Sequence, residues 1–241
     1  MRNPKKSLSQ NFLKDKNICK KIIKETNIKN NTVLEIGPGY GFLTDFILKE
    51  KPKEFILIEK DKKIFEFLKK KYLNENNISI LNQDILNFNY KNFNKIVVIS
   101  NLPYNISSKI ILNLFKNSEH FKEAILMVQK EMALKFDYNI KKLNKYKFLS
   151  KIFIHYKRCF DVSPNVFFPK PKVSSSVIKF KFNKKNVDYN KAIKFSSLIF
   201  KNKRKKISNN IFISEKEVLK ISNKRVEEIN MSELLMIYNF F

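Results

Sequence analysis

Val33-Leu34-Glu35-Ile36-Gly37-Pro38-Gly39-Tyr40-Gly41 holds all three glycines of this 241-residue chain. Three glycines kept at one turn indicate backbone conformations or close contacts that side chains would obstruct. An apolar run, residues 32–36, precedes the turn, and a helix-like run, residues 42–48, follows it. A strand, a glycine turn and a helix in this order are typical of a nucleotide-binding loop in an α/β sheet. The spacing matches neither the dinucleotide fingerprint nor a phosphate loop, so a purely structural turn stays open.

Acidic residues follow the next two expected strands. Residues 55–58 form a second apolar run, and Glu59 comes directly after it, close to the offset of a ribose-binding acid. A third run, residues 78–81, is followed by Gln83 and Asp84. Acids just past successive strands indicate the ligand-binding edge of an open parallel sheet, although each alone is as well explained as a solvated strand end.

A fourth run, residues 96–99, is followed by Asn101-Leu102-Pro103-Tyr104. This is a form of the Asn/Asp-x-Pro-Tyr motif of enzymes that methylate exocyclic amines of bases. The Asn101 amide oxygen and the Leu102 carbonyl can accept both hydrogens of an adenine N6 and so localise its lone pair. Pro103 stiffens the loop, and Tyr104 offers a ring face to an extruded base. The alternative is a polar β-turn.

At this point the chain resembles the small-subunit rRNA adenine N6,N6-dimethyltransferases, from about Lys5 to its C-terminus. The matching segments, in order, are Ser9-Gln10-Asn11-Phe12-Leu13, Glu35-Ile36-Gly37-Pro38-Gly39 with Leu43-Thr44, Ile58-Glu59-Lys60-Asp61, Gln83-Asp84, Asn101-Leu102-Pro103-Tyr104-Asn105-Ile106-Ser107, Val128-Gln129-Lys130-Glu131 and Phe167-Phe168-Pro169-Lys170-Pro171-Lys172-Val173. One departure is Tyr146-Lys147-Phe148-Leu149-Ser150, where the family usually has glycine in place of Lys147. That change puts the local loop shape in doubt.

The resemblance implies S-adenosyl-L-methionine as cofactor. Glu59 would hold the ribose hydroxyls and Asp84 the adenine amine, while Asn101 lies where cofactor and target base meet. Phe167 would stack on the target base opposite Tyr104, with a core phenylalanine as the alternative. The implied cofactor-binding residues are Asn11, Leu13, Gly37, Gly39, Glu59, Asp84 and Asn101, and the implied catalytic residues are Asn101, Leu102, Pro103, Tyr104 and Phe167.

The formal net charge of +27 is typical of a polyanion binder. Only four of the 49 basic residues are arginine, however, and a lysine-rich composition also follows from an A/T-rich genome. The segment 200–210 resembles a basic stretch of the family, and we expect it to form a basic helix on rRNA phosphates. Its candidate RNA-binding residues are Lys201, Lys203, Arg204 and Lys205. The alternative is a solvated helical face.

Other features exclude several classes of protein. Cys19 and Cys159 have no pairing or metal-ligand spacing, so we expect reduced structural thiols and no metal site. No apolar run is long enough to span a membrane, and no secretory signal is seen. We therefore expect a cytoplasmic, monomeric protein with no membrane partner.

The expected fold is α/β: a class I S-adenosylmethionine-dependent methyltransferase, Rossmann-like, with a mostly parallel seven-stranded sheet and a small all-helical C-terminal domain. A helix is expected at 17–24, a fifth strand at 124–128, a helix at 145–156, a sixth strand at 158–162 and an antiparallel last strand at 176–182. The catalytic domain would comprise residues 1–184 and the helical domain residues 185–241, with a linker at 183–186.

The resemblance implies dimethylation of N6 on two adjacent adenines near the 3′ end of 16S rRNA during small ribosomal subunit biogenesis. The expected partner is therefore 16S rRNA in the small subunit or its precursor. Two alternatives stay open. One is the 23S rRNA adenine N6-methyltransferase of the macrolide-resistance type, and the other is a non-catalytic rRNA-binding assembly factor on the same fold.

Overall fold

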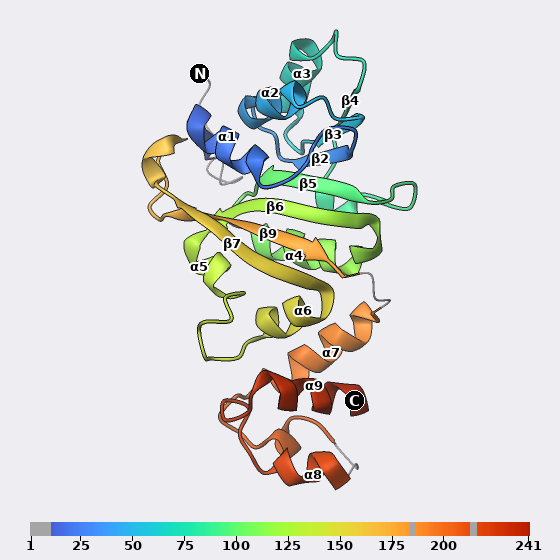
Figure 1. Ribbon diagram of the computed structural model, residues 1–241, viewed down its shortest axis with the longest axis vertical. Coiled ribbons are helices and arrows are strands. Elements are labelled where there is room, and N and C mark those ends of the chain that lie inside the picture. The colour runs from blue at the N-terminus through green and yellow to red at the C-terminus, as the bar shows by residue number, and fades with distance from the viewer. Residues whose placement is uncertain (1–10, 184–186, 213–215) are drawn as a thin grey trace. The chain divides into compact units, whose positions relative to one another are not determined.

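The computed structural model describes residues 11–183, 187–212 and 216–241, and the chain divides into two compact units. Of the described residues, the first unit holds those up to Ala133 together with Tyr156–Phe182. The second holds Leu134–His155 and those from Asn183 onward (Figure 1). The expected domain division near residue 184 differs from this grouping, because Leu134–His155 associates with the C-terminal helices. A functional division at residue 184 stays a prediction, and most of the expected linker lies outside the described residues.

In the described part of the chain, seven strands form one sheet in the order β4-β3-β2-β5-β6-β9-β7. The β2–β3, β3–β4, β2–β5 and β5–β6 pairs are parallel, and β9 runs antiparallel to β6. This confirms the expected mostly parallel sheet with an antiparallel last strand. The strands are β2 Thr32–Ile36, β3 Glu54–Ile58, β4 Ile78–Leu81, β5 Ile96–Asn101, β6 Phe121–Gln129, β7 Ile154–Val162 and β9 Ser175–Phe182.

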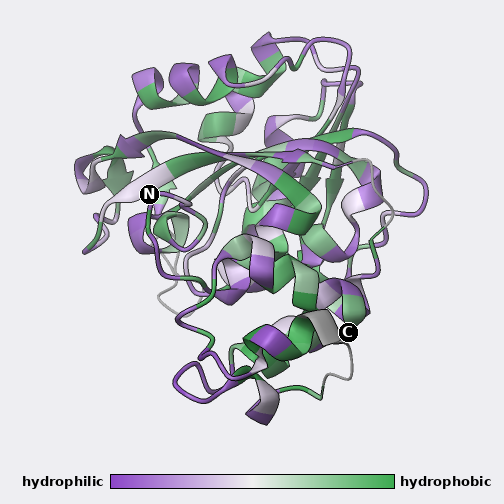
Figure 2. Ribbon diagram, turned by 60° about the horizontal axis from the view of Figure 1, so that its bottom comes forward, coloured by the Kyte–Doolittle hydropathy of each residue, from purple (hydrophilic) through white to green (hydrophobic). Residues whose placement is uncertain are grey.

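The central strands are apolar on both faces because helices cover both. Alternate residues such as Val33 and Val97 join the core under helices α1 (Lys16–Lys24), α2 (Phe42–Lys49) and α3 (Lys62–Lys71). On the other face lies α4 (Ser107–Lys116), whose Phe115 ring centroid is 5.8 Å from that of Phe180 on β9 (Figure 1). The covering helices are apolar toward the strands and polar on the outside (Figure 2). This is the layering of a doubly wound α/β fold.

Two aspartates fix where the helices on the first face begin. The Asp15 carboxylate accepts the backbone N–H groups of Asn17 and Ile18 at 2.8 and 2.9 Å. Asp61 accepts the N–H of Lys63 at the start of α3. Such caps satisfy N–H groups that have no partner in the first turn of a helix. The helix expected at 17–24 is therefore confirmed, with its first residue at Lys16.

A small two-stranded sheet was not expected from the sequence. Strand β1 (Phe12–Leu13) pairs antiparallel with β8 (Phe167–Phe168), with Phe12 opposite Phe168 and Leu13 opposite Phe167. Two-residue strands are too short to give a visible alternation of apolar and polar residues. The pairing joins the N-terminal segment to the Phe-x-Pro-x-Pro segment. The first two residues of the Ser9–Leu13 motif lie outside the described residues.

The described residues also form the following helices. They are the 3₁₀ helices Ile85–Asn87, Ser118–His120, Pro164–Val166 and Ile207–Asn209, and the α-helices α5 Lys130–Leu134, α6 Lys145–Phe153, α7 Tyr189–Ile199, α8 Lys216–Ser222 and α9 Met231–Phe240. Among the described residues, none of the helices combines the length and the apolar character needed to cross a bilayer.

The second unit has an aromatic core. The rings of Phe148, Phe195 and Tyr238 lie with their centroids 5.0–5.3 Å apart. The Lys147 side chain, which stands where the family usually has glycine, is buried, and its ammonium donates to the carbonyl oxygens of Ile140 and Lys142. Lys147 thus ties the loop before α6 in place. The loop shape that the departure put in doubt is held by this side chain.

The expected basic helix at the 200–210 segment was wrong. Helix α7 ends at Ile199, residues 201–204 form turns, and Ile207–Asn209 form a 3₁₀ helix. Consecutive like charges disfavour a helix, and the stretch from Lys201 to Lys206 offers no apolar side chain to pack on a core.

Candidate active site

A cleft of about 1000 Å³ lies at the carboxyl ends of β2, β3, β4 and β5 in the first unit. Open parallel sheets bind ligands at this edge, and the volume is large enough for a nucleotide-sized ligand. The structure brings all the predicted cofactor-binding and catalytic residues except Phe167 to this cleft. Its lining includes Asn11, Leu13, Gly37, Gly39, Glu59, Asp84, Asn101, Leu102, Pro103 and Tyr104.

The glycine loop has the backbone that its sequence predicted. Gly37, Gly39 and Gly41 have φ values of 64°, 56° and 79°, a region that side chains strain. A Cβ on Gly39 would lie 2.8 Å from the Phe12 ring, and one on Gly37 would lie 3.8 Å from Pro103. The loop is thus packed between β1 and the Asn-Leu-Pro-Tyr segment.

Glu59 comes directly after β3, and its side chain is buried. One carboxylate oxygen, Oε1, accepts the backbone N–H of Asp61 at 2.8 Å. Burial raises the pKa of this carboxyl group, while the N–H groups of Asp61 and Gly39 act in the opposite direction. These bonds fix the carboxylate at the edge of the cleft.

Asp84 carries an ion pair that the sequence did not indicate. Its Oδ2 lies 2.8 Å from the Lys60 ammonium, and its Oδ1 accepts the N–H of Leu86 at 3.0 Å. The hydrogen bond from Lys60 is the largest cause of the lowered pKa of Asp84, which is therefore ionised at neutral pH. Lys60 also lines the cleft. Its only signal in the sequence was its place beside Glu59.

Asn101 is the last residue of β5, and its side-chain amide nitrogen contacts the N-terminal segment. Its Nδ2 donates to the carbonyl oxygen of Asn11 at 2.9 Å. Its Oδ1 is buried and has no hydrogen-bond partner. Among the described residues, it is the buried side-chain oxygen or nitrogen atom of which this is true. Leu102 is held by its N–H to the carbonyl oxygen of Met127 at 3.0 Å. The backbone around Asn101 is therefore fixed, while one strong acceptor is free to bind a ligand donor.

Of the two aromatic residues expected at the cleft, Tyr104 lies there and Phe167 does not. Tyr104 lines the cleft, and its hydroxyl lies 2.6 Å from Ser175 Oγ. The Phe167 side chain is 5% exposed and belongs to the core under α1 and α2, so it does not line the cleft. Phe168 does line it, with 43% of its side chain exposed, and the Lys14 ammonium lies 4.1 Å from its ring centroid. Phe167 and Phe168 differ in this way because neighbouring residues of a strand point to opposite faces.

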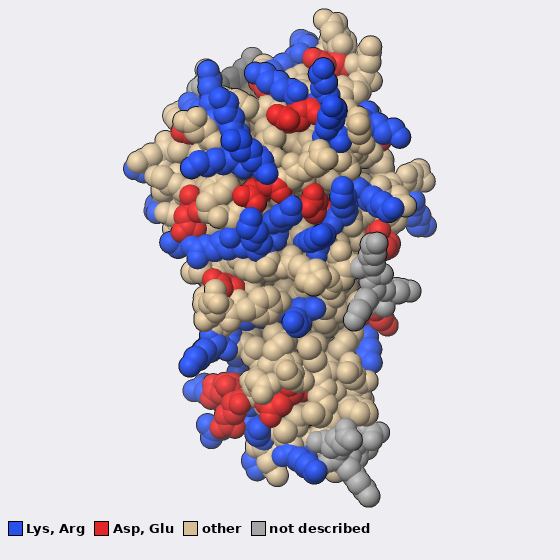
Figure 3. Space-filling view, viewed as in Figure 1, with Lys and Arg blue, Asp and Glu red and all other residues tan. Residues whose placement is uncertain are grey.

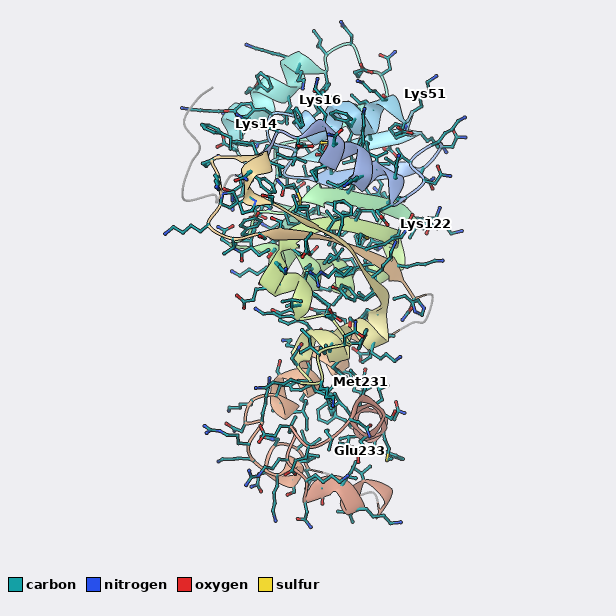
Figure 4. The ribbon with its side chains drawn as sticks, turned by 60° about the vertical axis from the view of Figure 1, so that its left-hand side comes forward. Lys14, Lys16, Lys51, Lys122, Met231 and Glu233 are labelled. Carbon is teal, nitrogen blue, oxygen red and sulfur yellow. The ribbon has the colours of Figure 1, made fainter. Side chains whose placement is uncertain are left out.

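Basic side chains are spread over the visible face with acidic ones among them (Figure 3). Lys14 and Lys51 lie on opposite sides of the first unit (Figure 4). The candidate RNA-binding residues Lys201, Lys203, Arg204 and Lys205 all belong to the second unit. The pKa of Lys203 is lowered, first by burial and then by Lys142. Two lysines close together indicate a locally positive surface in that unit.

The thiols and acids form no metal site within the residues described here. Cys19 and Cys159 are free, and burial raises the pKa of each thiol to about 12. Both are therefore protonated and unreactive at neutral pH.

The sheet order, the glycine loop after β2 and the acid after β3 together define a class I S-adenosylmethionine-dependent methyltransferase fold. The sequence profile described as ribosomal RNA adenine dimethylase matches residues 1–241, and the chain belongs to this family. It is similar to proteins named ribosomal RNA small subunit methyltransferase A. The one from Malacoplasma penetrans is 42% identical, covering 91% of this chain and 82% of its own, and the one from Mycoplasmopsis synoviae is 40% identical, covering 99% and 97%.

Solved structures agree with this fold. A dimethyladenosine transferase from Plasmodium falciparum aligns with a TM-score of 0.77 and 26% identity, over 95% of this chain and all of that one. The 23S rRNA methyltransferase ErmE aligns with a TM-score of 0.74 over 95% of this chain and 98% of that one. At 19% identity, ErmE supports the fold alone.

Proposed function

We propose that this chain transfers methyl groups from S-adenosyl-L-methionine to N6 of two adjacent adenines near the 3′ end of 16S rRNA. Its closely similar relatives carry the name ribosomal RNA small subunit methyltransferase A. Each adenine would receive two methyl groups, in the small ribosomal subunit or its precursor. A monomeric protein acting in the cytoplasm is part of the proposal.

The single observation that carries the proposal is the buried Oδ1 of Asn101, which has no hydrogen-bond partner in the described structure. A buried acceptor without a donor costs about 1–3 kcal/mol, so a site that keeps one is built to receive a donor. The N6 amine of adenine supplies such a donor. Acceptance of its hydrogens by Asn101 and by the Leu102 carbonyl would localise the lone pair on N6.

The residues of the cleft also fit the cofactor. Bound there, S-adenosylmethionine would supply a methyl group on a positively charged sulfur, which N6 can attack in line. Glu59 would accept the ribose hydroxyls, and Asp84 the adenine amine. Gly37 and Gly39 line the cleft, and without a Cβ they would let the ligand approach the backbone closely. Asn11 and Leu13 would complete the wall nearest Asn101.

After each methyl transfer N6 is cationic and releases one proton readily, so no strong general base is required in this cleft. The target base must leave its stack to reach Asn101. Tyr104 and Phe168 line the cleft and offer aromatic faces to it. We assign the stacking partner of Tyr104 to Phe168, with Phe167 supporting it from the core. The lysines of the second unit, with Arg204, would bind rRNA phosphates.

Mass spectrometry of nucleosides tests the proposal. Unmethylated small subunits and, separately, large subunits are incubated with the protein and isotope-labelled cofactor. N6,N6-dimethyladenosine is expected in the small-subunit rRNA alone, at two adjacent positions near its 3′ end. Label in large-subunit rRNA would favour the 23S methyltransferase. Binding to small subunits without any label would favour the non-catalytic assembly factor.

A further inference from the structure

The glycine loop is held by three side chains: Asp45 and Lys71, which line the cleft, and Tyr72, which does not. Tyr72 follows the last residue of α3, and its side chain is 7% exposed. Its hydroxyl lies 2.6 Å from Asp45 Oδ1 and 3.0 Å from the carbonyl oxygen of Gly41. A Cβ on Gly41 would collide with this hydroxyl. The contact therefore explains the third glycine as much as its backbone conformation does.

Lys71 adds a second set of bonds to the same place. Its ammonium lies 2.7 Å from Asp45 Oδ2, 3.2 Å from the carbonyl oxygen of Tyr40 and 3.3 Å from that of Gly41. Asp45 stands in the first turn of α2, so the end of α3 is bound to the start of α2 through both oxygens of one carboxylate. The carbonyl groups of Tyr40 and Gly41, at the end of the glycine loop, are thus bonded by Lys71, and that of Gly41 also by Tyr72.

We propose that Tyr72, Lys71 and Asp45 form a clamp that positions the glycine loop for the cofactor; this rests on the proposed use of S-adenosylmethionine. Gly41 precedes α2 and has no side chain to cap the helix, so the loop lacks the bond that usually fixes a helix start. The clamp supplies that fixation from α3. Tyr72 does not line the cleft, and we therefore regard it as a positioning residue and not a catalytic one.

Three glycines within five residues make this loop costly to order. Each glycine loses more backbone freedom on being fixed than any other residue does. If the clamp were absent, cofactor binding would have to order the loop, and the affinity would fall by that cost. The rate at saturating cofactor would be unchanged, because the bound loop then has its working shape.

The test compares two buried tyrosines of the first unit. Tyr72→Phe removes the clamp hydroxyl. Tyr90→Phe removes a hydroxyl that lies 3.0 Å from Asn113 Oδ1 and does not line the cleft. Titration calorimetry with S-adenosylhomocysteine should show a dissociation constant raised roughly three- to tenfold by Tyr72→Phe and unchanged by Tyr90→Phe. Urea unfolding should show a similar small loss of stability in both variants.

Steady-state methylation kinetics separate a positioning role from general destabilisation, because they measure KM for the cofactor and kcat independently. Tyr72→Phe should raise the KM for S-adenosylmethionine by the same factor and leave kcat unchanged. Lys71→Met should act in the same direction, whereas Lys70→Met, which removes the neighbouring cleft-lining lysine of the same turn of α3, should not. Because both side chains act through Asp45, the double variant Tyr72→Phe with Lys71→Met should lose less than the product of the two effects.

Each contrary result is distinct. Wild-type protein that fails to bind S-adenosylhomocysteine would overturn the proposed cofactor, and the clamp with it. If the wild type binds S-adenosylhomocysteine and both Tyr72→Phe and Lys71→Met bind it with the same affinity, the clamp alone is overturned. Equal losses of affinity in Tyr72→Phe and Tyr90→Phe would also overturn it, since they would reduce the effect to general destabilisation.

Discussion

The side-chain nitrogen of Asn101 donates to the backbone oxygen of Asn11 across 2.9 Å, joining residues that are 90 positions apart in the chain. This bond uses the donor end of the amide and so orients the acceptor end, Oδ1. The N-terminal segment thus holds Asn101 in a single orientation. The segment is itself held by β8, with which β1 pairs.

Asn101→Ala should lower the methylation rate on the order of a hundredfold in a single-turnover assay at saturating cofactor and RNA. The reason is the loss of an acceptor that acts on N6 as its lone pair is localised, similar in size to the loss of one preorganised hydrogen-bond partner in other enzymes. RNA affinity should change little. Asn94→Ala, the same change at an exposed position just before β5 that does not line the cleft, is the control. A near wild-type rate for Asn101→Ala would rule out the proposed role.

Glu59→Ala and Asp84→Ala should each weaken S-adenosylmethionine binding about tenfold or more, as measured by calorimetry. One hydrogen bond to a charged group is worth roughly 1.5–3 kcal/mol. Asp84→Ala should show the smaller effect, because its carboxylate is already shared with Lys60. Glu50→Ala removes an exposed acid at the far end of α2 and should change nothing. Wild-type affinity in both folded cleft variants would contradict the assignment.

Phe168→Leu should weaken RNA binding and leave stability nearly unchanged, since the side chain is largely exposed. Stacking of one base on an aromatic ring is worth about 1–3 kcal/mol. Phe167→Leu should do the opposite, lowering the urea midpoint by creating a cavity in the core. Binding isotherms and unfolding curves for the two variants separate the roles. Reduced RNA affinity in Phe167→Leu at unchanged stability would return the stacking role to Phe167, as the family resemblance implies.

These two phenylalanines show where sequence reasoning ends. The motif assigns stacking to Phe167, but a two-residue strand sends one side chain into the core and its neighbour to the cleft, and nothing in the sequence says which. Similarly, Tyr72 gives no signal of its contact with Gly41, because the contact is 31 residues away and depends on how α3 packs.

What could be predicted follows from simple rules. The strands from β2 to β6 were found because each is an apolar run, although the run at β4 is only partly buried. Glu59, Asp84 and Asn101 were grouped because parallel strands end at one edge. The sixth strand was expected from Arg158 and begins at Ile154. Its first residues, 154–157, alternate in polarity as a strand does, but they follow α6 directly, with no turn residue to mark where the helix ends.

Glu35→Gln should remove a pH dependence of stability. Glu35 is buried beneath the loop, accepts the Thr44 hydroxyl at 2.7 Å, and burial raises its pKa to about 8 from about 4.5. Between these two values the folded protein keeps a proton that the unfolded chain releases. The contribution of Glu35 to the free energy of unfolding is therefore fully present below about pH 4.5 and is lost as the pH rises through about 8.

In urea unfolding, the wild type should lose stability relative to Glu35→Gln by on the order of 1 kcal/mol per pH unit between these limits. Taking the difference between the two proteins cancels the other titrating groups. Measurements at pH 5.5 and 8 are sufficient. A difference that does not change with pH would show that Glu35 is ionised in the folded protein.

Replacing Lys201 and Lys205 together by Gln should weaken rRNA binding and flatten its salt dependence. Removing one lysine–phosphate interaction should reduce the log–log salt slope by something under about one unit, by analogy with B-DNA. The fold and cofactor affinity should not change, because exposed lysines contribute little to stability and the cleft lies in the first unit.

The matched control replaces Lys51 and Lys122, which are exposed and do not line the cleft. If the lysines only reflect genome composition, the slope will fall by the same small amount in both double variants. A larger fall for the variant of Lys201 and Lys205 assigns RNA binding to the turn after α7, and equal slopes remove that role.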